Sequence, residues 1–440
     1  DLSPDMLFDV LDETTVRRTR RFIKNHYPSE TIPDGEGGET RITFPDVSPR
    51  RINYTFQDTF GDDFFEYVAR GLAAGDRDDG DLTLARYQPS RYIEGEKEGS
   101  ELSLVGLLRT GLLKRFESSS RAFANTLDRM IRQYEAALGL LENGYFPEPD
   151  AIDEWIETDN DEAMDELLAG EGKIDITSSH VDRDGLEQDL KSDLHILREW
   201  HDEASEVTRE DDEKLHALGN ELKTIVEEAD EDATNDDAFR QNRKVLIFSY
   251  FEDTVDWIYD YLTEQAEENP DLESYKGRIA AVAGSNSKHG VSRKCAVHGF
   301  APDSTDAPAG TKDEFDILIT TDVLGQGVNL QQARYVINYD LPWNPMRVVQ
   351  RNGRIDRINS PHPEVYPYSI FPDDRLDDLL KLEHRVREKL TQAARSIGID
   401  NEVIPGMETM EANFTDKVRN INSLQNEEAD LYEQGGKDAA

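Results

Sequence analysis

The sequence predicts an α/β protein. A parallel sheet with crossover helices is expected, preceded by a mostly helical insert domain and followed by C-terminal helices. From about residue 242 to 372, short continuous apolar runs alternate with helix-like segments, which is typical of a parallel sheet covered on both faces. Between about 61 and 240, apolar residues recur instead at a helical period.

The predicted insert domain covers residues 61–241. In the segment 104–134 the apolar positions fall close to a helical period: Leu108, Leu112, Leu113, Phe116, Phe123, Leu127 and Met130. Two further helices are expected at 186–204 and 212–232, and an acidic polar linker follows near 229–242. Residues 1–60 are mixed in character, with a basic stretch at 15–28 and a glycine-rich turn at 34–40.

The predicted sheet domain covers residues 242–372. Strands are expected at 244–251, 278–284, 315–323, 333–341 and 365–371, with helices at 253–266 and 345–357. A long charged helix is expected from Asp374, within the C-terminal segment 373–440.

The helix predicted at 345–357 carries a basic face in an acidic chain. Asn344 can cap it, and Pro345 suits its first position. Arg347, Gln350, Arg354 and Arg357 follow at spacings of three and four, so they are expected on one face. Ligands of parallel sheets bind at the carboxyl ends of the strands, and guanidinium groups suit phosphate. A solvated basic helix paired with surface acids is the alternative.

Composition narrows the class of protein. The formal net charge is −44 and the sequence pI is about 4.5. Abundant Asp and Glu with scarce lysine is similar to proteins of salt-loving microbes, although an acidic partner-binding protein is also compatible. The single Cys295 excludes an internal disulfide and a cysteine-rich zinc site, so no metal site is predicted, and it is expected to be buried.

Three motifs in the sheet domain resemble those of superfamily 2 helicases. "QRNGRIDRI" (350–358) resembles motif VI, "LITTDVLGQGVNLQQA" (318–333) motif V and "VLIFSYF" (245–251) motif IV. "TVRRTRRFIKN" and "LLKRFESSSRAF" resemble segments of prokaryotic Swi/Snf-like ATPases. The resemblance runs from about residue 15 to 400 and implies a RecA-like C-terminal motor lobe.

The resemblance assigns roles residue by residue. It implies that Arg354 and Arg357 are catalytic and meet ATP, which is bound with Mg²⁺ mostly by a first lobe. Gln350, Gly325, Gly327 and Asn329 would bind the nucleotide, and Ser249, Thr320 and Thr321 would bind nucleic acid. The implied partner is double-stranded DNA. Residues 1–60 would be the connector from the first lobe, and 373–440 a helical brace.

One expected motif is missing. No G-x-x-x-x-G-K-[ST] phosphate loop occurs in the 440 residues. The first lobe is therefore expected upstream of Asp1 or absent, and the chain alone is predicted not to hydrolyse ATP.

Two alternatives remain open. Asp322 after the motif V threonine is more similar to RNA-directed helicases, and a non-catalytic, partner-binding relic of a motor has the same motifs. No apolar run reaches ~18 residues and no signal segment opens the chain, so no membrane span is predicted. The expected location is the cytoplasm, on the nucleoid, of a halophilic prokaryote.

Overall fold

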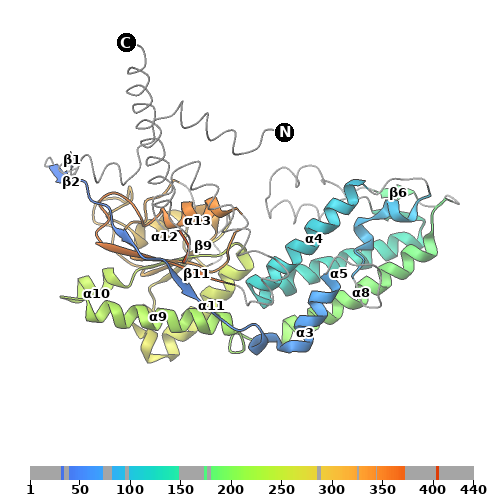
Figure 1. Cartoon of the computed structure of the whole chain (residues 1–440), viewed down its shortest axis with the longest axis horizontal. Coiled ribbons are helices and arrows are strands. Elements are labelled where there is room, and N and C mark those ends of the chain that lie inside the picture. The colour runs from blue at the N-terminus through green and yellow to red at the C-terminus, as the bar shows by residue number, and fades with distance from the viewer. Residues whose placement is uncertain are drawn as a thin grey trace, which may run out of the picture.

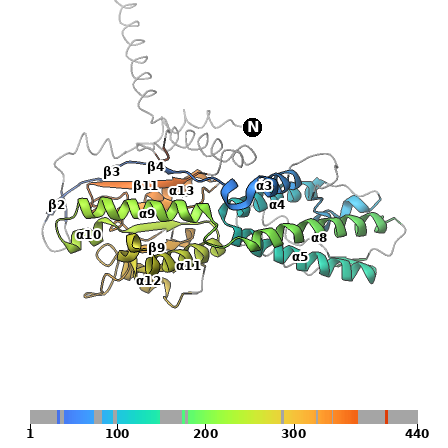
Figure 2. The ribbon, with the colours of Figure 1, turned by 90° about the horizontal axis from the view of Figure 1, so that it is seen from below.

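The computed structural model describes residues 31–33, 39–72, 82–94, 99–147, 173–175, 180–284, 289–324, 327–342, 344–371 and 403–405. They form a sheet lobe and a helical arm, joined at one end of the sheet (Figure 1 and Figure 2). The basic stretch at 15–28, Gly325 and nearly all of the C-terminal segment 373–440 lie outside the described residues.

The sheet of the lobe is parallel throughout. Its central strands are β7 (Val245–Phe248), β8 (Ile279–Val282), β9 (Ile317–Thr320), β10 (Tyr335–Asn338) and β11 (Glu364–Ile370). They lie in the order β8-β9-β7-β10-β11. The five strands overlap the five predicted segments, so the prediction of a RecA-like parallel sheet is confirmed.

Residues 46–52 add strands that the sequence did not predict. β3 (Asp46–Val47) and β4 (Arg50–Ile52) both pair in parallel with β11 at the edge of the sheet. They were missed because two or three residues beside Ser48 and Pro49 show no period of their own. β1 (Thr31–Pro33) and β2 (Glu39–Arg41) form a separate antiparallel pair.

Alternate side chains of the central strands enter two different cores. Val245 and Ile247 face one core, together with α9 (Glu213–Glu231), α11 (Glu252–Glu268) and the short helix η3 (Pro270–Tyr275). Leu246 and Phe248 face the other core, together with α12 (Arg293–Phe300). Helix α9 lies within the range 61–241 predicted as the insert, but it packs on the sheet. The short α10 (Asp236–Asn242) leads from α9 into β7.

We call the helices α3 (Gln57–Leu72), α4 (Gly99–Ser118), α5 (Ser120–Glu142) and α8 (Arg183–Glu206) the arm. The single helix expected across 104–134 is in fact two, α4 and α5. Ser119 breaks the run because its side chain accepts a hydrogen bond from Ala122 N and caps α5. The short helices η1 (Ala85–Tyr87) and η2 (Pro89–Tyr92) pack on α8, and β5 (Tyr145–Pro147) pairs with β6 (Lys173–Asp175).

The arm core continues into the lobe. Leu341 and Val348 belong to the same apolar cluster as Phe116, Phe123 and Trp200 of the arm. Within the described residues no helix is long and apolar enough to cross a membrane. Cys295 is exposed on α12, so the prediction that it is buried was wrong.

Candidate active-site edge of the sheet

Polar side chains gather where three neighbouring strands end. Ser249 follows β7, Asp322 opens the short helix η4 (Asp322–Leu324) after β9, and Asp340 follows β10. Because these strands are parallel and adjacent, their carboxyl ends meet at one edge of the sheet. Helix α13 (Pro345–Asn352) begins at this edge.

Local sequence determines where α13 starts and stops. The side chain of Asn344 accepts a hydrogen bond from Met346 N, and Pro345 occupies the first turn as predicted. The helix ends at Asn352, five residues earlier than predicted. Beyond it the chain tightens, because the Arg354 and Ile355 amides bind carbonyls only three residues back. The predicted helix is therefore too long, and Arg354 and Arg357 lie in the turns after it.

Arg351 is the central buried cation of this edge. Its Nε and Nη2 donate to the two carboxylate oxygens of Asp322 at 2.6 and 2.9 Å, and its Nη1 donates to the Asp340 carbonyl at 3.0 Å. Arg347 adds a longer contact of 3.3 Å to Asp322. Burial opposes ionisation of Asp322, but the two arginines hold the pKa of its carboxyl below the usual value. The pair fastens the loop after β9 to α13.

Arg354 is held differently. Its Nε donates to the Gln350 carbonyl at 3.1 Å and its Nη1 to the Val328 carbonyl at 3.0 Å. Among the described residues no carboxylate lies within ion-pair distance of Arg354. Burial and the neighbouring charge of Arg357 both lower its pKa. A guanidinium that lies beside another cation and binds only carbonyl groups is suited to receive an anion.

Arg357 joins the loop after β9 to the turns after α13. Its Nε donates to the Gly353 carbonyl at 3.0 Å, and its Nη1 donates to Asn329 Oδ1. Gly327, in the same loop, has a φ of +79°, which favours glycine, and a Cβ there would meet nothing within 4 Å. The structure therefore holds Arg354 and Arg357 against the loop that carries Gly327 and Asn329.

The other predicted site residues lie in different surroundings. Gln350 is exposed. Ser249 is buried and its hydroxyl donates to Asp340, while Thr320 is buried and donates to the Thr321 carbonyl at 3.0 Å. Thr321 is partly exposed. In this structure the hydroxyls of Ser249 and Thr320 are thus turned inward.

The sequence analysis missed the buried partners. Arg351, Asp340 and Lys214 were not named as site residues, and Asp322 was noted only as a departure from a motif. The spacing of four between Arg347 and Arg351 on one helix was a usable signal, since a carboxylate at a neighbouring strand end can bind both.

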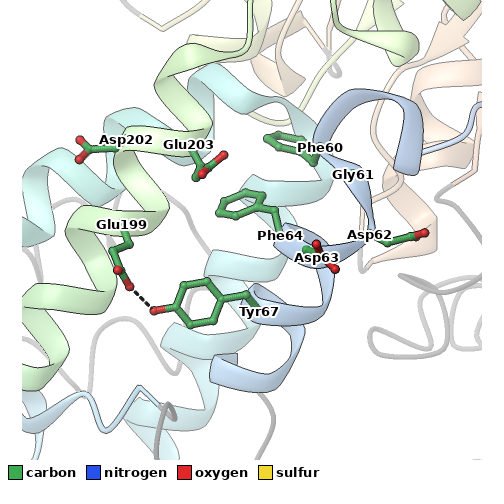
Figure 3. A pocket seen from close by; sticks show the side chains of 9 residues that line it. All are labelled: Phe60, Gly61, Asp62, Asp63, Phe64, Tyr67, Glu199, Asp202 and Glu203. Carbon is green, nitrogen blue, oxygen red and sulfur yellow. Dashed lines mark hydrogen bonds between the residues drawn. The ribbon is translucent and has the colours of Figure 1, made fainter.

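A hollow on the arm has the opposite electrostatic character. It has a volume of about 820 Å³ and lies between α3 and α8 (Figure 3). Tyr67 donates to Glu199 at 2.6 Å beside it. Its carboxylates are Asp62, Asp63, Glu199, Asp202 and Glu203. Because these groups repel phosphate, the hollow is no candidate for a nucleotide site. No cluster of metal-binding side chains occurs in the described part of the chain.

Comparison with known proteins identifies the lobe. Residues 232–359 match the family model described as the helicase conserved C-terminal domain. The uncharacterized ATP-dependent helicase YqhH of Bacillus subtilis (strain 168) is 32% identical over 111 residues, which are 25% of this chain and 19% of that protein. Chromodomain-helicase-DNA-binding protein 8 of Homo sapiens is 29% identical over 173 residues, 39% of this chain and 6% of that protein.

Among solved structures, the C-terminal part of the Fun30 ATPase domain matches with a TM-score of 0.36 and 17% identity, over 87% of this chain and 99% of that chain. The match to each curated relative thus spans less than a fifth of that relative's length. Residues 232–359 are thus similar to helicase C-terminal domains, and the relatives named above are superfamily 2 helicases.

Proposed function

We propose that this chain is the C-terminal half of an ATP-dependent motor that tracks along double-stranded DNA. In this proposal Arg354 and Arg357 face ATP held mainly by a first RecA-like lobe outside these residues. The observation that carries it is the cationic pair in the turns after α13: two neighbouring guanidinium groups in a chain of net charge −44. Superfamily 2 relatives add the expectation of ATP use.

The residues around Arg354 and Arg357 fit a triphosphate bound with Mg²⁺. ATP supplies the phosphoanhydride bond whose hydrolysis drives the motor. Arg357 would stabilise negative charge that builds on the transferred phosphoryl group, and Arg354 would bind the terminal phosphate. By the motif resemblance, Gln350, Asn329, Gly325 and Gly327 would also bind the nucleotide. Since the described residues hold no carboxylate cluster for Mg²⁺, we assign the metal to the first lobe.

Nucleic acid is proposed to contact the lobe at Thr321, and at Ser249 and Thr320 after rearrangement of their hydroxyls. Asp322 made an RNA-directed helicase the alternative on sequence grounds. In the structure its carboxylate is bound by Arg351 and Arg347, so an intramolecular role accounts for the residue. We therefore favour DNA, acted on in the cytoplasm at the nucleoid.

The test is ATP hydrolysis by the native polypeptide from its source cell. We expect duplex DNA to stimulate hydrolysis and residues 1–440 alone to show none. Stronger stimulation by duplex RNA than by duplex DNA would favour the RNA-directed alternative. No hydrolysis with either nucleic acid would contradict a motor and favour a non-catalytic relic.

We also propose that the protein works in concentrated salt. With a net charge of −44, the acidic side chains repel one another in dilute buffer. Salt weakens this repulsion, because the Debye screening length falls from about 10 Å at 0.1 M to about 3 Å at 1 M. The melting temperature should therefore rise between 0.1 M and 2 M KCl. A melting temperature that stays level or falls would contradict a halophilic origin.

A further inference from the structure

A buried polar cluster lies where the arm meets the lobe. Its side chains come from the end of α4, the starts of α9 and α11 and the carboxyl edge of the sheet, and all are buried. We call it the junction cluster and define it as Glu117, Ser118, Lys214, Ser249, Thr254 and Asp340.

Asp340 is the centre of this cluster. One carboxylate oxygen accepts from Ser249, from Tyr250 N at 2.9 Å and from Ser118 Oγ at 3.1 Å. The other accepts from Lys214 Nζ at 3.1 Å. Its backbone carbonyl accepts from Arg351, the residue that fastens α13. A single residue therefore contacts the arm, the sheet edge and the arginine-bearing helix.

Lys214 supplies the matching charge. Its Nζ donates to Glu117 Oε1 at 2.8 Å and to the Glu117 carbonyl at 2.9 Å, besides the bond to Asp340. The ammonium also lies 4.5 Å from the centre of the Tyr339 ring. Buried ion pairs contribute little net stability compared with apolar groups of the same size, but they are specific in geometry. The cluster thus favours one orientation of α4 relative to the sheet edge.

Hydroxyl groups extend the contact between arm and lobe. Ser118 Oγ and Ser119 Oγ lie 2.7 and 2.8 Å from Thr254 Oγ1 on α11. Asn125 on α5 donates to Asp253 Oδ1 at 2.9 Å. These bonds lie beside the apolar contact of Leu341 and Val348 with the arm core. Polar and apolar contacts together join the arm to the lobe over one continuous surface.

We infer that Asp340 and Lys214 are positioning residues that hold the arm at one angle to the part of the lobe that carries α13. A fixed angle would keep the arm in one geometry relative to Arg354 and Arg357 while the motor works, so this role rests on the proposed motor function. Neither residue touches the nucleotide in this arrangement. Both act through Ser118, Glu117 and Arg351.

The experiment measures the arm angle directly and needs neither ATP nor nucleic acid. Spin labels are placed on Cys295, the single and exposed cysteine, and on a Tyr145→Cys substitution at the exposed β5 of the arm. Pulsed electron paramagnetic resonance then gives the distance distribution between lobe and arm. We expect one narrow distribution for the otherwise unchanged chain, and one roughly twofold broader for Asp340→Asn and Lys214→Met.

Glu187→Gln is the matched control, because Glu187 pairs with Lys191 on the exposed face of the same arm. Its distribution should stay narrow. If Asp340→Asn and Lys214→Met do not fold, Ser118→Ala decides, since it removes only the hydroxyl from the cluster and leaves the buried charges paired. An unchanged width in every folded junction variant overturns the inference, whatever the outcome of the ATP hydrolysis test.

Discussion

The hollow on the arm and the carboxyl edge of the sheet differ in how far they expose their charged side chains. The hollow on the arm leaves five carboxylates at an open surface (Figure 3). At the sheet edge, Arg351, Asp340 and Lys214 are buried and bound to one another or to neighbouring groups. Acidic surface keeps a protein hydrated and soluble, whereas buried charge needs defined partners. The edge therefore depends on buried charges with defined partners, whereas the exposed carboxylates of the hollow do not need them.

The largest effect is expected from Arg351→Met. Its guanidinium is fully buried, and removing it leaves Asp322 without its bidentate partner. Breaking a fully buried pair costs about 3–5 kcal/mol of unfolding free energy. Because Asp322 is 24% exposed and keeps its contact with Arg347, we expect a loss at the lower end of that range. Urea unfolding followed by circular dichroism measures this loss. A loss as small as that of a surface pair would mean that the edge does not depend on its buried charges.

A pH effect of intermediate size is expected from the junction cluster. Glu117 is buried beside Lys214 and Asp340, and burial raises its pKa to about 7 from the usual 4.5. A raised carboxyl pKa means that the folded state keeps the proton that the unfolded state releases. The contribution of Glu117 is thus present below pH 4.5 and is lost as pH rises through about 7.

Glu117→Gln keeps the size of the side chain and removes the titration. Relative to this variant, the wild type should lose on the order of 3 kcal/mol of unfolding free energy from pH 4.5 to 8. The difference between the two proteins is the correct measure, because other groups also titrate. Burial of His362, for example, lowers its pKa to about 4 and makes the chain less stable in acid. A difference that is constant with pH would contradict a buried, protonated Glu117.

The smallest effect is expected on the arm surface. Arg198 on α8 pairs with Glu135 on α5 at 2.6 Å, and both side chains are about half exposed. Exposed pairs of this kind contribute about 0.2–1 kcal/mol. Arg198→Ala should therefore shift urea unfolding only slightly, and less in high salt. A loss of unfolding free energy comparable with that of Arg351→Met would mean that an exposed pair on the arm stabilises the fold as much as a buried arginine at the sheet edge.

Much of the lobe was predictable because its strands are continuous apolar runs, such as 245–248, which leave no alternative but burial. The motif arginines could be found for a similar reason, since their spacing is local. The end of α13 was missed although Gly353 at its C-cap is a helix-stop signal, because Arg354 and Arg357 continue the spacing of the basic face. The pairing of Arg351 with Asp322 joins residues 29 positions apart and depends on the strand order, which single-sequence periodicity does not reveal.

The packing of the arm on the lobe was not predictable from the sequence for the same reason. The predicted helices exist, but only the fold places Lys214 of α9 against Glu117 of α4 and Asp340 beyond β10. On sequence alone each of the three reads as a surface charge in an acidic chain. Their burial follows from contacts across more than 90 residues.

The central claim is that Arg354 and Arg357 face ATP, and it is tested most directly by Arg357→Ala in the native polypeptide. Nucleic-acid-stimulated ATP hydrolysis should fall by about 1,000-fold or more, because the cation that stabilises the transferred phosphoryl group is lost. Arg198→Ala is the matched control and should hydrolyse ATP at the wild-type rate. Urea unfolding checks that both variants fold. Undiminished hydrolysis by a folded Arg357→Ala protein would contradict the proposal that Arg354 and Arg357 face ATP.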